Sequence, residues 1–97
     1  MQFNERIYHI SLVEDDGALR TLLTRHIRQS GFPIRSYATA AEFRASTEQY
    51  DLVILDVMLP GTSGLDLCRW LRQRSAVPII FISARSSHTD RIVGLGL

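Results

Sequence analysis

Residues 51–61 read Asp51-Leu-Val-Ile-Leu-Asp-Val-Met-Leu-Pro-Gly61. The four apolar residues after Asp51 do not alternate with polar residues, which is typical of a strand covered on both faces in a parallel sheet. Asp56 ends this run, and the Pro-Gly pair that follows is typical of a loop. The stretch therefore predicts a central strand over residues 51–56 with a carboxylate at its carboxyl end.

Strand-like and helix-like windows alternate on both sides of this strand. Short apolar runs predict further strands over residues 7–13, 32–37 and 78–82. Apolar residues at helical spacing, or capping residues, predict helices around residues 19–27, 39–47, 67–71 and 87–96. This order predicts an α/β fold, an open doubly wound parallel sheet with right-handed crossovers and helices on both faces.

Composition and charge narrow the class of protein. The chain has 97 residues, 45% of them hydrophobic and 22% charged, which indicates one globular domain. Eleven basic residues, all arginine, against ten acidic ones give a net charge of +1, so no overall field favours nucleic acid or an anionic membrane. We expect a cytoplasmic protein, because a single cysteine forms no internal disulfide and the first residues lack a signal-peptide pattern.

Acidic and hydroxyl side chains follow several of the predicted strands. Glu14, Asp15 and Asp16 follow the first, Asp56 ends the third, and Ser83 follows the fourth. Because the carboxyl ends of parallel strands meet at one edge of the sheet, we expect these groups to lie close together. Clustered carboxylates either take up protons or bind a cation, and an all-oxygen site suits Mg²⁺ better than Ca²⁺ or Mn²⁺.

A purely structural interpretation exists for the acidic triplet. Acidic residues before a helix cap its free N–H groups, which accounts for one or two of Glu14, Asp15 and Asp16. It does not account for Asp56, because a buried and unpaired carboxylate costs several kcal/mol. The combination of the triplet with Asp56 therefore favours a site.

Three segments resemble the motifs of one known family. The stretch Ile10-Ser-Leu-Val-Glu-Asp-Asp16 resembles the first strand and acidic pair of the receiver domain of two-component response regulators. Leu55-Asp-Val-Met-Leu-Pro-Gly61 resembles its phosphoacceptor segment, and Phe81-Ile-Ser-Ala84 resembles the segment with the switch hydroxyl. The resemblance runs over essentially all 97 residues. It implies a flavodoxin-like fold with the four strands in the order 2-1-3-4.

The resemblance also implies roles for individual residues. Asp56 would be the phosphoacceptor, and Asp15, Asp56 and the main-chain carbonyl of Met58 would coordinate Mg²⁺. Glu14 would act on the metal mainly through a bound water. Ser83 would hydrogen-bond the phosphoryl group, and no organic cofactor is implied.

The function that follows from the resemblance is a step of a two-component phosphorelay. A sensor histidine kinase would be the partner that supplies the phosphoryl group, and phosphorylation would switch an output, such as a DNA-binding domain outside this chain. The protein would then be a switch rather than an enzyme, with at most self-phosphorylation and self-dephosphorylation.

The sequence departs from the family at its C-terminal end. The family places a lysine on a fifth strand and closes the fold with a fifth helix, whereas residues 1–97 contain no lysine and end within the expected fourth helix. The strand at Ile79–Ile82 would then be an apolar edge, which proteins avoid exposing. We therefore expect residues 1–97 to be a receiver domain without its C-terminal strand and helix, as a piece of a longer chain or as a self-dimer or swapped dimer.

Three alternative functions compete with this hypothesis. A degenerate or truncated receiver that only mediates protein contacts is favoured by the missing lysine. A phosphatase of the haloacid dehalogenase type would carry a second acid where Met58 stands. A flavodoxin-like carrier would need a first loop that cradles phosphate, whereas this loop is acidic.

Overall fold

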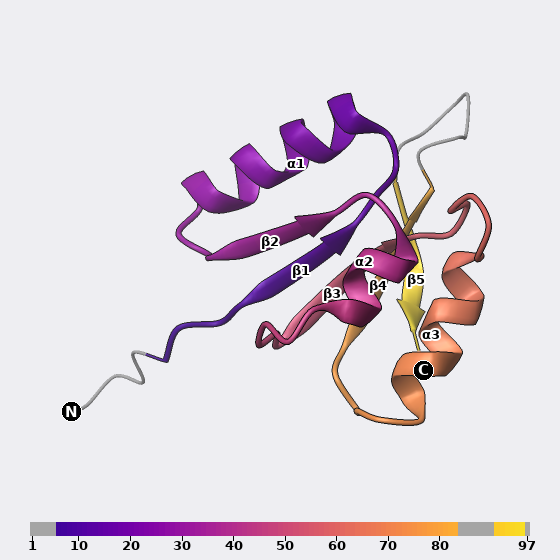
Figure 1. Cartoon of the computed structure of the whole chain (residues 1–97). Helices are drawn as coiled ribbons and strands as arrows, with labels where there is room; N and C mark the ends of the chain where they lie inside the picture. The colour runs from indigo at the N-terminus through magenta and orange to yellow at the C-terminus, as the bar shows by residue number, and fades with distance from the viewer. Residues whose placement is uncertain (1–5, 84–90, 97) are drawn as a thin grey trace.

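A five-stranded sheet forms the centre of the protein (Figure 1). The computed structural model describes residues 6–83 and 91–96. The strands are β1 (Ile10–Val13), β2 (Ile34–Tyr37), β3 (Leu52–Asp56), β4 (Ile79–Ser83) and β5 (Arg91–Gly96). Their order is β2-β1-β3-β4-β5, and the first four are parallel. The predicted order 2-1-3-4 is therefore confirmed, with β3 in the middle.

Three helices cover the two faces of the sheet. They are α1 (Gly17–Gln29), α2 (Ala40–Ala45) and α3 (Gly64–Arg72). Helix α1 packs Leu23 and Ile27 against Ile10, Leu12 and Ile34. Helices α2 and α3 lie on the opposite face, as Figure 1 shows. Within the described residues, no helix has the length and apolar character needed to cross a membrane.

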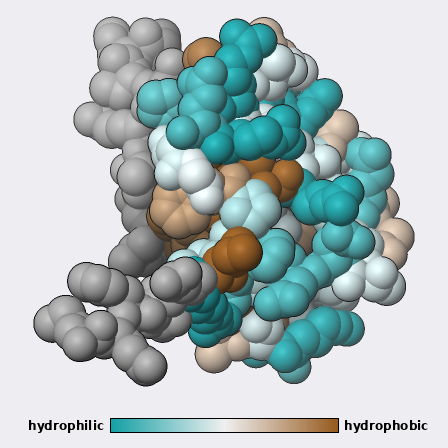
Figure 2. Space-filling view, turned by 90° about the vertical axis from the view of Figure 1, so that its left-hand side faces the viewer, coloured by the Kyte–Doolittle hydropathy of each residue, from teal (hydrophilic) through white to brown (hydrophobic). Residues whose placement is uncertain are grey.

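The larger part of the core lies between the sheet and the helices α2 and α3. Alternate residues of β1, β3 and β4 point to this face, and the side chains of α2 and α3 close it from outside. Its buried members are Val13, Ala40, Phe43, Val53, Leu55, Leu59, Leu67, Cys68, Leu71, Val77, Ile79 and Phe81. Cys68 is a free thiol within this cluster. Figure 2 shows a different side of the molecule, where hydrophilic residues dominate the described surface and apolar ones gather near its centre.

The helix starts follow from local hydrogen bonds that the sequence encodes. Asp16 caps α1, since its side chain accepts a hydrogen bond from the Leu19 N–H at 3.1 Å. Thr39 caps α2 by accepting from the Glu42 N–H, and Glu42 in turn accepts from the Ala38 N–H. The helix that capping residues predict around residues 39–47 therefore begins with this reciprocal cap.

The first strand is shorter than the pattern predicts. Residues 7–9 precede β1 rather than belonging to it, and Ile7 and Tyr8 are exposed. The main-chain N–H of His9 instead donates to the Asp51 carboxylate at 2.8 Å, and Arg6 forms an ion pair with the same carboxylate. The Asp51 N–H also donates to the His9 carbonyl oxygen at 2.7 Å, so main-chain and side-chain hydrogen bonds together hold the chain just before β1.

The prediction of a helix over residues 87–96 is wrong for the part that the structure describes. Residues 91–96 form β5, which runs antiparallel to β4 in a register that pairs Ile80 with Leu95. Two causes act together: the two glycines at 94 and 96 weaken a helix, and the apolar edge of β4 offers unpaired N–H and C=O groups. The expectation that β4 is the edge strand is therefore also wrong, although β5 is antiparallel and differs from the fifth strand that the family resemblance implies.

Candidate functional site

Three carboxylates meet at the carboxyl ends of β1 and β3. Glu14 and Asp15 follow β1 directly, and Asp56 is the last residue of β3. The two strands are neighbours, with Val13 opposite Leu55, so Glu14 comes level with Asp56. One carboxylate oxygen from each of the three residues lies within 4.8 Å of the others. The predicted convergence of these three acids is thus present.

The site is buried although it is highly acidic. Glu14 is 0% exposed and Asp56 is 1% exposed, in the same part of the fold as the apolar core. Two carboxylates in such surroundings are costly unless hydrogen bonds or a cation compensate their charge.

Main-chain groups hold one oxygen of each buried carboxylate. Glu14 Oε2 accepts a hydrogen bond from the Asp16 N–H at 3.0 Å, and Asp56 Oδ1 accepts from the Met58 N–H at 2.9 Å. Both bonds span two residues, which is the spacing of a local turn closed by a side chain. The loops after β1 and β3 therefore fix the direction in which these carboxylates point.

Arg20 fixes the loop after β1 from behind. Its Nη1 donates to the main-chain carbonyl oxygens of Glu14 at 2.9 Å and Asp15 at 3.4 Å. No motif in the sequence predicts this contact of Arg20. The only available signal is its place on the first turns of the predicted helix, from which a long side chain can reach back to the preceding loop.

The electrostatics of the site favour a proton on Glu14 when no cation is bound. The pKa of Glu14 is raised to about 8. Burial is the main cause, and the neighbouring Asp56 and Asp15 contribute to the same increase. The hydrogen bond from the Asp16 N–H opposes these effects but does not outweigh them. A proton on Glu14 and a divalent cation at the three carboxylates would therefore compete for the same site.

The residues present fit a hard divalent cation. Glu14 Oε1 and Asp56 Oδ2 are buried and accept no hydrogen bond within the described part of the chain. Carboxylate oxygens are the preferred ligands of Mg²⁺, and this ion keeps several waters in its octahedral shell. A small cation beside these oxygens would satisfy them and neutralise the cluster.

The other predicted site residues take different positions. Asp16, which the sequence predicts to lie beside the other acids, instead caps α1 and is not a member of the three-carboxylate cluster. Met58 follows Asp56 in the turn after β3, with 52% of its side chain exposed, and its role as a carbonyl ligand stays a prediction. Ser83 is the last residue of β4, beyond Ile82, which pairs with Asp56. It therefore lies at the same edge of the sheet, and the role of its hydroxyl stays a prediction.

Known proteins are similar to this chain in sequence and in fold. Residues 10–97 match the model of the response regulator receiver domain. The chain is 46% identical over 93 residues to the transcriptional regulatory protein GltR of Pseudomonas aeruginosa, an alignment that covers 91% of this chain and 38% of that protein. It is 42% identical over 92 residues to the sensory transduction protein RegX3 of Mycolicibacterium smegmatis, with 91% and 40% covered.

A solved structure of a response regulator is similar to this chain as well. The response regulator TrrA of Thermotoga maritima, in complex with Mg²⁺-BeF, has a TM-score of 0.77 and 32% identity, and the match covers 84% of this chain and 73% of that one. The chain spans about two-fifths of the length of the two curated relatives named above. On these matches and the order of its strands, the chain belongs to the receiver domain family of two-component response regulators.

Proposed function

We propose that Asp56 accepts a phosphoryl group from a sensor histidine kinase, at a site where Asp15, Asp56 and the main-chain carbonyl of Met58 would coordinate Mg²⁺ and Glu14 would act on it mainly through a bound water. The observation that carries the proposal is the buried Asp56 Oδ2, which accepts no hydrogen bond within the described residues and lies among two other carboxylates. The second oxygen of Asp56 is held by the Met58 N–H, so the carboxylate has a defined orientation. A carboxylate that is fixed, buried and uncompensated is suited to act as a nucleophile.

Phosphoryl transfer to Asp56 requires mainly that the reacting groups are positioned and that their negative charge is neutralised. An oxygen of the Asp56 carboxylate forms a bond to phosphorus while the bond from phosphorus to the donor imidazole nitrogen breaks. The bonding pair stays on the imidazole, which takes up a proton from solvent, and Asp56 becomes an acyl phosphate. Bound Mg²⁺ supplies positive charge that lowers the repulsion between the carboxylates and the phosphoryl oxygens.

Two further residues have proposed roles around this step. Glu14 orients a water of the metal rather than binding the metal directly, and the Ser83 hydroxyl donates to a phosphoryl oxygen. An acyl phosphate adds about −1.5 to −2 charge and three acceptor oxygens at this edge of the sheet. A hydroxyl drawn toward those oxygens changes the balance between two arrangements of the loop after β4.

The consequence we propose is a signalling switch rather than a turnover enzyme. Named relatives are transcriptional and sensory transduction regulators of which this chain spans about two-fifths, so the proposed output is a DNA-binding domain elsewhere in the protein. Residues 1–97 act as the receiver domain, and a self-dimer or swapped dimer is the proposed assembly. The second candidate is a receiver that binds partners without being phosphorylated.

Intact-mass spectrometry after incubation with acetyl phosphate and Mg²⁺ distinguishes the two candidates. We expect the parent protein to gain one phosphoryl group and Asp56→Asn to gain none. Asp66→Asn is the matched control, because Asp66 is an exposed aspartate paired with Arg69 on α3. This control variant should be phosphorylated like the parent. A parent that gains nothing while binding Mg²⁺ would favour the non-phosphorylated receiver.

A further inference from the structure

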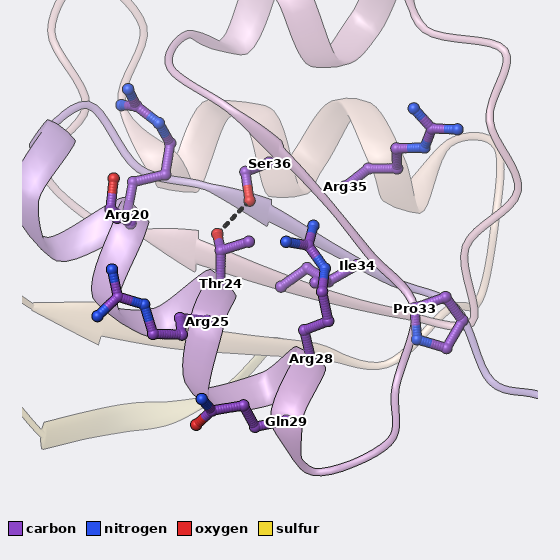
Figure 3. A pocket seen from close by; sticks show the side chains of 10 residues that line it. Arg20, Thr24, Arg25, Arg28, Gln29, Pro33, Ile34, Arg35 and Ser36 are labelled. Atoms are coloured by element: carbon purple, nitrogen blue, oxygen red, sulfur yellow. Dashed lines mark hydrogen bonds between the residues drawn. The ribbon is translucent and has the colours of Figure 1, made fainter.

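A groove outside the acidic site lies between α1 and the edge strand β2. It is open to solvent and has a volume of about 950 Å³. Four of the eleven arginines of the chain line it, Arg20, Arg25 and Arg28 from α1 and Arg35 from β2, and no acidic residue does (Figure 3). None of the three site carboxylates belongs to its lining. The groove is therefore a separate, strongly basic feature of a chain whose net charge is only +1.

The four arginines differ in their partners. Arg35 is paired with Glu48 at 3.1 Å. Arg20 donates to main-chain carbonyl oxygens, which are neutral. Neither Arg25 nor Arg28 has an ion-pair or hydrogen-bond partner among residues 6–83. Like charges gathered on one face destabilise the protein unless an anion joins them, so the groove has an electrostatic preference for a multivalent anion.

Hydroxyl groups lie between the arginines. Thr24 of α1 and Ser36 of β2 are hydrogen-bonded to each other across the groove. Figure 3 shows Arg20 on one side of this pair and Arg28 reaching from α1 toward β2 on the other, above Ile34, while Arg25 extends along the outer side of the helix. Guanidinium groups and hydroxyl donors together are the side chains that bind phosphate oxygens most often.

We propose that this groove binds the linked phosphate groups of a small soluble ligand. The charges of Arg25 and Arg28, with Arg20 and Arg35 also in the lining, suit a chain of two or three phosphates, which carries several negative charges in a small volume. A volume of about 950 Å³ is in the range of sites for small-molecule ligands. An acidic peptide is the less suitable occupant, because successive side chains of an extended segment alternate in direction and only every second carboxylate could face the arginines.

The source of the phosphate chain is either a nucleotide or inorganic polyphosphate, and the groove chemistry is common to both. Pro33 and Ile34 form the apolar part of the lining, on which a nucleoside could rest. Comparison of ATP with inorganic tripolyphosphate therefore identifies the source. Tighter binding of ATP assigns the nucleotide, and equal or tighter binding of tripolyphosphate assigns the inorganic chain.

Titration calorimetry on the whole chain without Mg²⁺ tests the proposal with sodium tripolyphosphate, ATP and a hexaglutamate peptide. We expect one tripolyphosphate per chain and a loss of affinity of about tenfold or more in the double variant Arg25→Gln/Arg28→Gln. Arg44→Gln is the matched control, because Arg44 is an exposed arginine of α2 outside the groove. It should bind like the parent, and circular dichroism shows whether each variant is folded.

Three results would overturn the proposal. The first is that neither tripolyphosphate nor ATP binds the folded parent. The second is that both bind the double variant as tightly as the parent, since the arginines of the groove would then not be the site. The third is that hexaglutamate binds more tightly than tripolyphosphate and loses its affinity in the double variant, which would assign the groove to an acidic protein segment.

Discussion

Gly64, the first residue of α3, lies against the main chain of Asp56. A β-carbon built on Gly64 would be 2.2 Å from the carbonyl oxygen of Asp56 and 2.9 Å from the α-carbon of Val57. The Gly64 N–H also donates to the Val57 carbonyl oxygen at 3.0 Å. The start of α3 and the end of β3 are therefore in direct contact, and only glycine permits this contact at position 64.

We predict that Gly64→Ala destabilises the protein and displaces Asp56. The new methyl group meets main-chain atoms, which cannot move aside as a flexible side chain can, so the free energy of unfolding should fall by about 2 kcal/mol. Urea unfolding followed by circular dichroism measures this change. Gly17→Ala is the control, because its β-carbon would be 3.7 Å from the nearest atom, an ordinary contact. Equal stability of the two variants would contradict the tight contact at Gly64.

Leu71 is predicted to be a major source of stability. It lies on α3 with 0% exposure, inside the larger core cluster. Leu71→Ala removes buried apolar surface and leaves a cavity, so we expect a loss of about 2–5 kcal/mol. Leu65→Ala on the same helix is the matched control, because Leu65 is 48% exposed, and it should change stability by about 0.5 kcal/mol or less. Similar losses for both variants in urea unfolding would show that α3 packs through another face.

The stability of the metal-free protein should depend on pH through Glu14. The pKa of Glu14 is about 8 in the folded protein and near 4.5 as an ordinary value, so between these values the folded state holds a proton that the unfolded state has lost. The stabilisation that comes from this proton is therefore fully present below about pH 4.5, and this contribution to the free energy of unfolding is lost as the pH rises toward 8.

Urea unfolding in EDTA at pH 5.5 and pH 8 measures this effect. We expect the midpoint of the parent to be clearly lower at the higher pH and the midpoint of Glu14→Gln to change much less, since glutamine does not titrate. Added Mg²⁺ should raise the midpoint of the parent at pH 8 back toward its value at pH 5.5, because the cation replaces the proton among the carboxylates. A parent midpoint that is the same at both pH values would contradict the raised pKa.

Local patterns in the sequence are enough to predict the central part of the fold. The unbroken apolar run before Asp56 predicts a strand buried on both faces, and the structure places it in the middle of the sheet. Of the four acids that follow predicted strands, Glu14, Asp15 and Asp56 converge as predicted, because parallel strands direct their carboxyl ends to one edge, whereas Asp16 caps α1.

Features that depend on tertiary contacts could not be predicted in the same way. Residues 91–96 carry a pattern compatible with a helix, and pairing with the edge of β4 decides in favour of a strand. Arg20 stabilises the acidic loop through main-chain carbonyls, a contact that leaves no motif in the sequence. The groove between α1 and β2 gathers arginines that are up to 15 positions apart, from Arg20 to Arg35, and a net charge of +1 conceals this local excess.

Chemical mapping of the phosphorylated residue tests the central claim most directly. The protein is incubated with acetyl phosphate and Mg²⁺, treated with borohydride, which reduces an acyl phosphate to an alcohol and turns aspartate into homoserine, and digested with trypsin. Cleavage after arginine separates residues 7–20, with Glu14 and Asp15, from residues 45–69, with Asp56. We predict homoserine at position 56 alone, dependent on Mg²⁺. Reduction within residues 7–20, or at another aspartate of residues 45–69, would contradict the assignment of Asp56 as the phosphoacceptor.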